Sequence, residues 1–130
     1  MSYCILVVDD NPINLKLACD VLQSEGYVVE RASDAEQAFE RVQKLPIDLI
    51  LMDVALPGMD GLTLTRMLKA DLTFRHIPVV ALTAFAMKGD DVRAMEAGCD
   101  GYIPKPIDTR MLPDQVMEVL NRRSTIIDRD

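Results

Sequence analysis

Five polar or charged side chains stand at the ends of short apolar runs in the sequence: Asp9, Asp10, Asp53, Thr83 and Lys105. A carboxylate at the end of a buried strand costs free energy unless a positive group meets it. Three carboxylates that lie close together also repel one another, and proteins tolerate such clusters mainly where a cation is bound. If the fold brings these residues together, they form a site for cation-assisted chemistry.

The same residue types indicate phosphoryl transfer. Oxygen ligands without a nearby histidine or cysteine favour a hard cation, Mg²⁺ or alternatively Mn²⁺. Lys105 and Thr83 offer a positive charge and a hydroxyl donor to phosphoryl oxygens. Asp53 is then the nucleophile, because a carboxylate can form an acyl phosphate. The sequence has no Walker-type glycine loop, so we expect the phosphoryl group to arrive on a donor and not on bound ATP.

Apolar runs of strand length alternate five times with helical patterns. The expected strands are residues 4–8, 27–32, 49–53, 78–82 and 101–104. The expected helices cover about 12–25, 34–43, 62–70, 90–97 and, from Asp108 or Thr109, 108–121. Parallel strands need such crossover connections. The pattern predicts a doubly wound α/β domain with a five-stranded parallel sheet, whose carboxyl strand ends would place all five side chains at one edge.

The first helix has the clearest start signal. Asn11 suits the N-cap and Pro12 the first helical position, which leaves Asp9 and Asp10 free for other roles. Gly26 suits the helix end. The residues that we expect to form its apolar face are Ile13, Leu15, Leu17, Ala18, Val21 and Leu22.

Composition narrows the class of protein. A chain of 130 residues is long enough for one domain with its own core, and 49% hydrophobic residues are typical of a globular protein. The net charge of −7 opposes binding to nucleic acid or to an anionic membrane. The three cysteines are an odd number without metal-type spacing and give no sign of disulfides, so we expect the protein to reside in a reducing cytoplasm. We expect no signal peptide or membrane span, one domain over residues 1–123, and a short polar tail over 124–130.

The motifs together resemble the receiver domain of two-component response regulators, the CheY-like superfamily. The resemblance covers about residues 5–120 and rests on Asp9–Asp10, Asp53 with the following Leu56–Gly61, Thr83–Ala84 and Lys105–Pro106. Residues 76–90 are similar to stand-alone receivers of the DivK type, and to receivers fused to hybrid kinases or diguanylate cyclases. The family fold is flavodoxin-like, with strand order 2-1-3-4-5.

The resemblance also implies a chemistry for the acidic residues. A sensor histidine kinase or phosphotransfer protein would donate a phosphoryl group to Asp53. Mg²⁺ would be bound by the side chains of Asp10 and Asp53 and by the backbone carbonyl of Ala55. Asp9 would act on the metal mostly through bound water.

The remaining roles implied by the resemblance concern switching. Lys105 would contact the phosphoryl group, and its peptide bond to Pro106 would be cis. Thr83 and Tyr102 would form a switch pair that responds to phosphorylation. A downstream protein partner would bind the face formed by residues 88–97, Tyr102 and the C-terminal helix. The receiver would catalyse only its own phosphorylation and a slow self-dephosphorylation, because Ala55 and Phe85 cannot position a water molecule.

Three other interpretations stay open on the sequence. The chain could be the receiver part of a hybrid kinase or diguanylate cyclase. A Mg²⁺-dependent phosphatase with an aspartyl nucleophile is less favoured, since such enzymes need a second acid where this chain has Ala55. A flavodoxin-type cofactor binder shares the fold, but residues 83–85 do not form a phosphate-binding loop.

Overall fold

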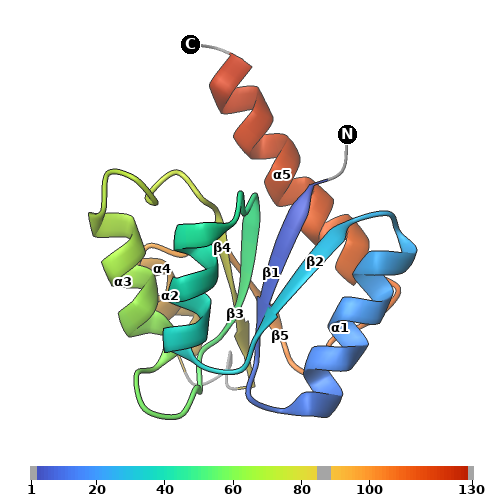
Figure 1. Ribbon diagram of the computed structural model, residues 1–130. Helices are drawn as coiled ribbons and strands as arrows, with labels where there is room; N and C mark the ends of the chain where they lie inside the picture. Colours follow the sequence, from blue (N-terminus) through green and yellow to red (C-terminus); the bar gives the residue numbers. More distant parts are fainter. Residues whose placement is uncertain (1–2, 85–88, 129–130) are drawn as a thin grey trace.

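The computed structural model describes residues 3–84 and 89–128, and its centre is a parallel five-stranded sheet (Figure 1). The strands are β1 (Cys4–Val8), β2 (Val28–Ala32), β3 (Leu49–Asp53), β4 (Val79–Thr83) and β5 (Gly101–Pro104). Their order is β2-β1-β3-β4-β5, and every neighbouring pair is parallel. The predicted fold class and strand order are confirmed.

Helices cover both faces of the sheet. They are α1 (Pro12–Ser24), α2 (Ala35–Lys44), α3 (Gly61–Ala70), α4 (Asp90–Glu96) and α5 (Leu112–Asp128). Buried residues of α1 and α5 share one apolar cluster, and those of α2, α3 and α4 share the other. Figure 1 shows the same division, with α1 and α5 beside each other and α2 beside α3.

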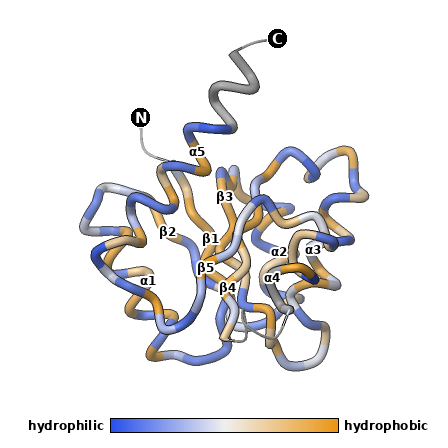
Figure 2. The backbone as a smooth tube through the Cα atoms, turned by 180° about the vertical axis from the view of Figure 1, so that it is seen from behind, coloured by the Kyte–Doolittle hydropathy of each residue, from blue (hydrophilic) through white to orange (hydrophobic). Residues whose placement is uncertain are grey.

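The central strands are buried on both faces, which explains their continuous apolar runs. Along β1, Ile5 and Val7 face the cluster of α1 and α5, while Leu6 and Val8 face the other cluster. All four are 0% exposed. Hydrophobic residues accordingly follow β1, β3 and β4 through the middle of the tube in Figure 2.

Capping side chains start three of the helices. Asn11 Oδ1 accepts hydrogen bonds from the backbone N–H groups of Ile13, at 2.9 Å, and Asn14, at 3.3 Å, as predicted. Asp34 and Asp60 cap α2 and α3 by accepting from the third residue along, each at 2.8 Å. Caps of this kind fix where each strand-to-helix connection ends.

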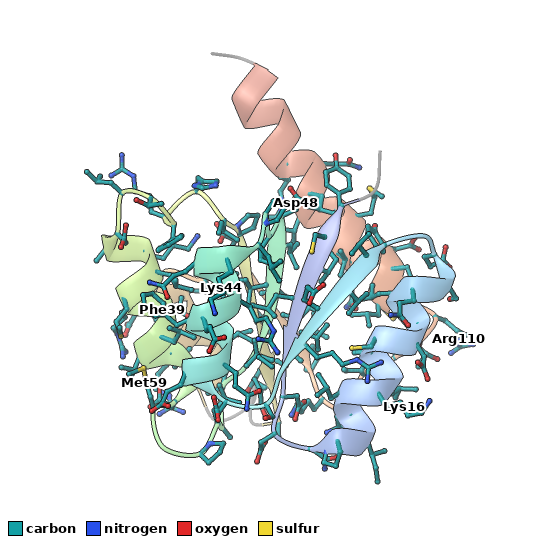
Figure 3. All side chains as sticks on the ribbon, viewed as in Figure 1. Lys16, Phe39, Lys44, Asp48, Met59 and Arg110 are labelled. Carbon is teal, nitrogen blue, oxygen red and sulfur yellow. The ribbon has the colours of Figure 1, made fainter. Side chains whose placement is uncertain are left out.

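The two edges of the sheet differ. At the amino ends of the strands, Asp48 Oδ2 accepts a hydrogen bond of 2.8 Å from the Cys4 backbone N–H, and Figure 3 shows Asp48 at the upper edge. Met59 lies near the lower edge, in the connection from β3 to α3. The carboxyl ends of all five strands point to this lower edge, where the predicted site residues lie.

The last helix differs from the prediction at both ends. It begins at Leu112 because Asp108 instead holds a turn, its Oδ1 accepting from the Arg110 backbone N–H at 2.9 Å. It continues past the predicted end at Asn121 to Asp128, and residues 122–128 contain no glycine or proline that would stop a helix.

The prediction that Ile13 packs inward was wrong. Its side chain is 76% exposed, whereas Ala18, Cys19 and Leu22 form the buried stripe of α1. With 3.6 residues per turn, Ile13 lies about 140° around the helix from Ala18. Ile13 therefore faces solvent in the first turn of α1, immediately after the predicted acidic residues.

Candidate functional site

The fold gathers the predicted residues at one edge of the sheet. Asp9 follows β1, Asp53 ends β3, Thr83 ends β4 and Lys105 follows β5. A pocket of about 240 Å³ opens at this edge. Its lining contains the predicted residues Asp9, Asp10, Asp53, Ala55 and Lys105, together with Asn11, Asn14, Val54, Leu82 and Ala84. Sequence reasoning gave Asn11 only a capping role and did not single out Asn14.

The Lys105 ammonium lies between two buried carboxylates. Its Nζ is 3.1 Å from Asp9 Oδ2 and 3.2 Å from Asp53 Oδ2. The Lys105 backbone N–H donates to the Thr83 carbonyl oxygen at 2.8 Å, which ties the end of β5 to the end of β4. The peptide bond from Lys105 to Pro106 is cis, as the resemblance implied.

Asp9 is held from both sides and is only 1% exposed. Its Oδ1 accepts a hydrogen bond of 2.9 Å from the Asn11 backbone N–H. Among the described residues its buried Oδ2 has no hydrogen bond of good geometry, although the Lys105 ammonium is close. A buried carboxylate oxygen of this kind has capacity for a further positive partner.

Asp53 is 4% exposed and accepts a hydrogen bond of 3.1 Å at Oδ1 from the Ala55 backbone N–H. Burial raises the pKa of the Asp53 carboxyl, and repulsion from Asp9 adds to this effect. The Ala55 N–H and the Lys105 ammonium act in the opposite direction but do not cancel it. Burial opposes the charge of Lys105, but the Asp9 and Asp53 carboxylates prevail and raise the Lys105 pKa.

The acidic residues fit a hard divalent cation. Asp9, Asp10 and Asp53 each offer one carboxylate oxygen, and these atoms lie within 4.8 Å of one another. With the ammonium of Lys105, three carboxylates leave a formal charge of −2. An all-oxygen donor set of this kind is what Mg²⁺ and related ions prefer.

Thr83 and Tyr102 lie on one face of neighbouring strands. Tyr102 is paired with Ala81, and Thr83 follows two residues later on the same face of β4. Thr83 is 1% exposed, whereas the Tyr102 ring is 44% exposed. Neither residue lines the pocket. The two side chains therefore lie on the same face of the sheet, with Thr83 buried and Tyr102 exposed to solvent.

The predicted partner face is partly described. On α4, Val92 and Met95 are 56% and 50% exposed. Tyr102 lies on β5, the edge strand of the sheet, which contacts α4. Lys88, with which this predicted face begins, and Phe85, to which the slow self-dephosphorylation was partly ascribed, lie outside the described residues. The described helices are too short or too polar to cross a membrane.

Gly61, the first residue of α3, has a contact with the site that sequence reasoning missed. Its backbone N–H donates to the Val54 carbonyl oxygen at 3.3 Å. A Cβ placed on Gly61 would overlap the carbonyl oxygen of Asp53 and lie 2.8 Å from Met52 Cγ. Gly61 is required for this close approach, because any larger residue would bring a Cβ into the Asp53 backbone.

Comparisons with known proteins agree on one family. The response regulator receiver domain matches residues 5–117. The polar-differentiation response regulator DivK of Brucella ovis is 45% identical over 107 residues, which cover 82% of this chain and 87% of that protein. DivK of Brucella anthropi is equally similar.

Solved structures show the same likeness. The chemotaxis response regulator CheY4 of Vibrio cholerae superposes with a TM-score of 0.86 at 26% identity, over 92% of this chain and 99% of that one. The signal receiver domain of a histidine kinase from Syntrophus aciditrophicus has a TM-score of 0.85 at 34% identity, over 92% and 91% of the two chains.

Proposed function

The chain belongs to the response regulator receiver domain family, and from that premise we propose that Asp53 is its phosphoacceptor. Receivers of this family are phosphorylation-dependent switches of two-component signalling systems and act as signalling domains. The assignment to Asp53 rests on its match to the family motif, with Leu56–Gly61 following it, and is supported by the placement of its Oδ2 beside the Lys105 ammonium, in the wall of the acidic pocket.

The proposed donor is a sensor histidine kinase or phosphotransfer protein that carries a phosphohistidine. An Asp53 carboxylate oxygen attacks the phosphorus, and an O–P bond forms as the N–P bond of the donor breaks. The imidazole nitrogen keeps the electron pair of the broken bond. The ring leaves as neutral imidazole, because its other nitrogen already carries a proton or because water supplies one. The Lys105 ammonium, next to Asp53 Oδ2, stabilises negative charge on the transferred group.

Asp10, Asp53 and the Ala55 backbone carbonyl are the proposed ligands of Mg²⁺ or Mn²⁺, with Asp9 acting through bound water. When bound, the ion neutralises charge on the phosphoryl oxygens. The clustered carboxylates support this assignment. Asp9 also holds Lys105 in place, so loss of Asp9 should weaken both the metal site and the position of the ammonium.

The switch follows from the charge and the acceptor oxygens that a phosphoryl group adds at Asp53. The Thr83 hydroxyl would donate a hydrogen bond to those oxygens. The Tyr102 ring would then turn inward on the face of the sheet that the two residues share. The proposed output surface consists of α4, Tyr102 and the exposed side of α5. Exposed Val92 and Met95 support it as a protein-binding face. The domain boundary at residue 123 stays a prediction.

Incubation with acetyl phosphate and Mg²⁺, followed by intact mass measurement, tests the proposal. We expect the mass to increase by one phosphoryl group. This increase should not occur when EDTA is present during the incubation, nor in Asp53→Asn. Asp108→Asn is the matched control, because Asp108 lies in the turn before α5 and does not line the pocket. An unmodified wild-type protein that is folded and binds Mg²⁺ would contradict the proposal. Rapid turnover of a small phosphoester would favour the phosphatase interpretation instead.

A further inference from the structure

Thr65 is a buried polar residue of α3 that the reaction does not obviously use. It is 0% exposed and lies on the helix face that packs against the sheet. Apart from the pocket residues Asp9 and Asp53 and the strand-end Thr83, it is the one polar side chain among the described residues that is buried to this extent. A buried hydroxyl costs free energy unless it is hydrogen-bonded, so its partners indicate its role.

The first partner of the Thr65 hydroxyl is the backbone of Gly61. Thr65 Oγ1 donates a hydrogen bond of 2.8 Å to the Gly61 carbonyl oxygen. Gly61 is the residue that touches the backbone of Asp53 so closely that a Cβ would not fit. The Thr65 hydroxyl thus fixes the carbonyl of the residue that packs against the proposed phosphoacceptor.

The loop between Asp53 and Gly61 is closed by short contacts. The Gly61 N–H donates to Val54, and the Ala55 N–H donates to the Asp53 side chain. Any shift of the first turn of α3 therefore moves the backbone that carries Asp53 and Ala55. The Cys99 thiol, in the connection before β5, lies beside Thr65: burial raises its pKa to about 11, and the Thr65 hydroxyl acts in the opposite direction.

We propose that Thr65 is a positioning residue for the reaction at Asp53, acting through Gly61. Its hydroxyl, bound to the Gly61 carbonyl oxygen, keeps the first turn of α3 packed against the Asp53 backbone. The inference rests on the proposed function, because it assumes that Asp53 accepts the phosphoryl group. It adds a residue that does not line the pocket and would not touch the phosphoryl group.

Thr65→Val removes the hydroxyl and keeps the branched shape. We expect the rate of phosphorylation by acetyl phosphate at limiting Mg²⁺ to fall roughly two- to tenfold, the size of one lost buried hydrogen bond. Thr65→Ser, which keeps the hydroxyl, should restore the rate. Thr65→Ala is the second variant should valine disturb folding, since it adds no methyl group against the Gly61 carbonyl.

Thr63→Val is the matched control on the same helix. Thr63 is half-buried, and its hydroxyl makes no hydrogen bond within the described part of the chain. Its rate should equal that of the wild type. Wild-type rates in both Thr65→Val and Thr65→Ala would overturn the inference, as would a Thr65→Ser protein as slow as Thr65→Val. A wild type that forms no adduct would overturn the proposed function itself, which separates the two failures.

Discussion

Replacing Gly61 by alanine should destabilise the domain, although the same change usually stabilises a helix. Alanine is better than glycine in a helix by about 1 kcal/mol, and it also restricts the unfolded chain. At Gly61, however, the new methyl group would overlap the Asp53 carbonyl oxygen and crowd Met52 Cγ at 2.8 Å. Backbone atoms cannot rotate away, so α3 or the Asp53 loop must move.

The expected size follows from overpacking, which costs about 1–3 kcal/mol in a well-packed interior. Overlap with a backbone atom belongs at the upper end of this range, so about 2 kcal/mol of destabilisation remains after the gain of about 1 kcal/mol in helix propensity. For a domain of this size a net loss of about 2 kcal/mol lowers the unfolding midpoint by roughly 7 °C. Gly101→Ala is the matched control, because the nearest atom to its Cβ would be Arg122 Nη2 at an ordinary 3.9 Å. Thermal unfolding by circular dichroism measures both variants. A Gly61→Ala protein as stable as Gly101→Ala would refute the packing described for the Asp53 loop.

Three further predictions concern charge and turnover. Burial raises the pKa of the Asp53 carboxyl, so the folded protein binds this proton more tightly than the unfolded chain does. The resulting stabilisation is fully present below the ordinary pKa of 3.8 and is lost as the pH rises through the raised pKa of the folded protein. Asp53→Asn should therefore resist urea better than the wild type at pH 7 without metal, and this advantage should shrink as the pH approaches 3.8. Ala55→Asn should shorten the lifetime of the phosphorylated protein, followed by mass spectrometry, because an amide can orient the attacking water; an unchanged lifetime would count against this role. Lys69→Met should cost about 1–3 kcal/mol in urea unfolding, because Lys69 Nζ donates to the Ile77 carbonyl at 2.8 Å and to Asp100 at 2.9 Å; an unchanged midpoint would show that these bonds contribute nothing.

Much of the fold could be predicted because the strongest signals are local. Continuous apolar runs identified the buried strands, and Asn11 with Pro12 marked the start of α1. The parallel arrangement then implied that Asp9, Asp53 and Lys105 meet, since carboxyl strand ends share one edge. The distances of 3.1 Å and 3.2 Å from Lys105 to the two carboxylates confirm that expectation.

What sequence reasoning missed depends on contacts between distant segments. Thr65 looks like an ordinary helix residue until the structure shows that its hydroxyl reaches Gly61 and that Cys99 lies beside it. The exposure of Ile13 depends on the angle at which α1 meets the sheet, and apolar spacing alone does not define that angle. The start of α5 was misplaced because an Asp can cap either a helix or the turn that precedes one.

The central claim is that Asp53, and not its acidic neighbours, receives the phosphoryl group. Borohydride reduces an acyl phosphate of aspartate to homoserine, and peptide mass mapping then locates the modified residue. After acetyl phosphate and Mg²⁺, the account predicts homoserine at position 53 and intact aspartate at Asp9 and Asp10. Homoserine at Asp9 or Asp10, or at none of the three in a protein that has gained a phosphoryl mass, would contradict it.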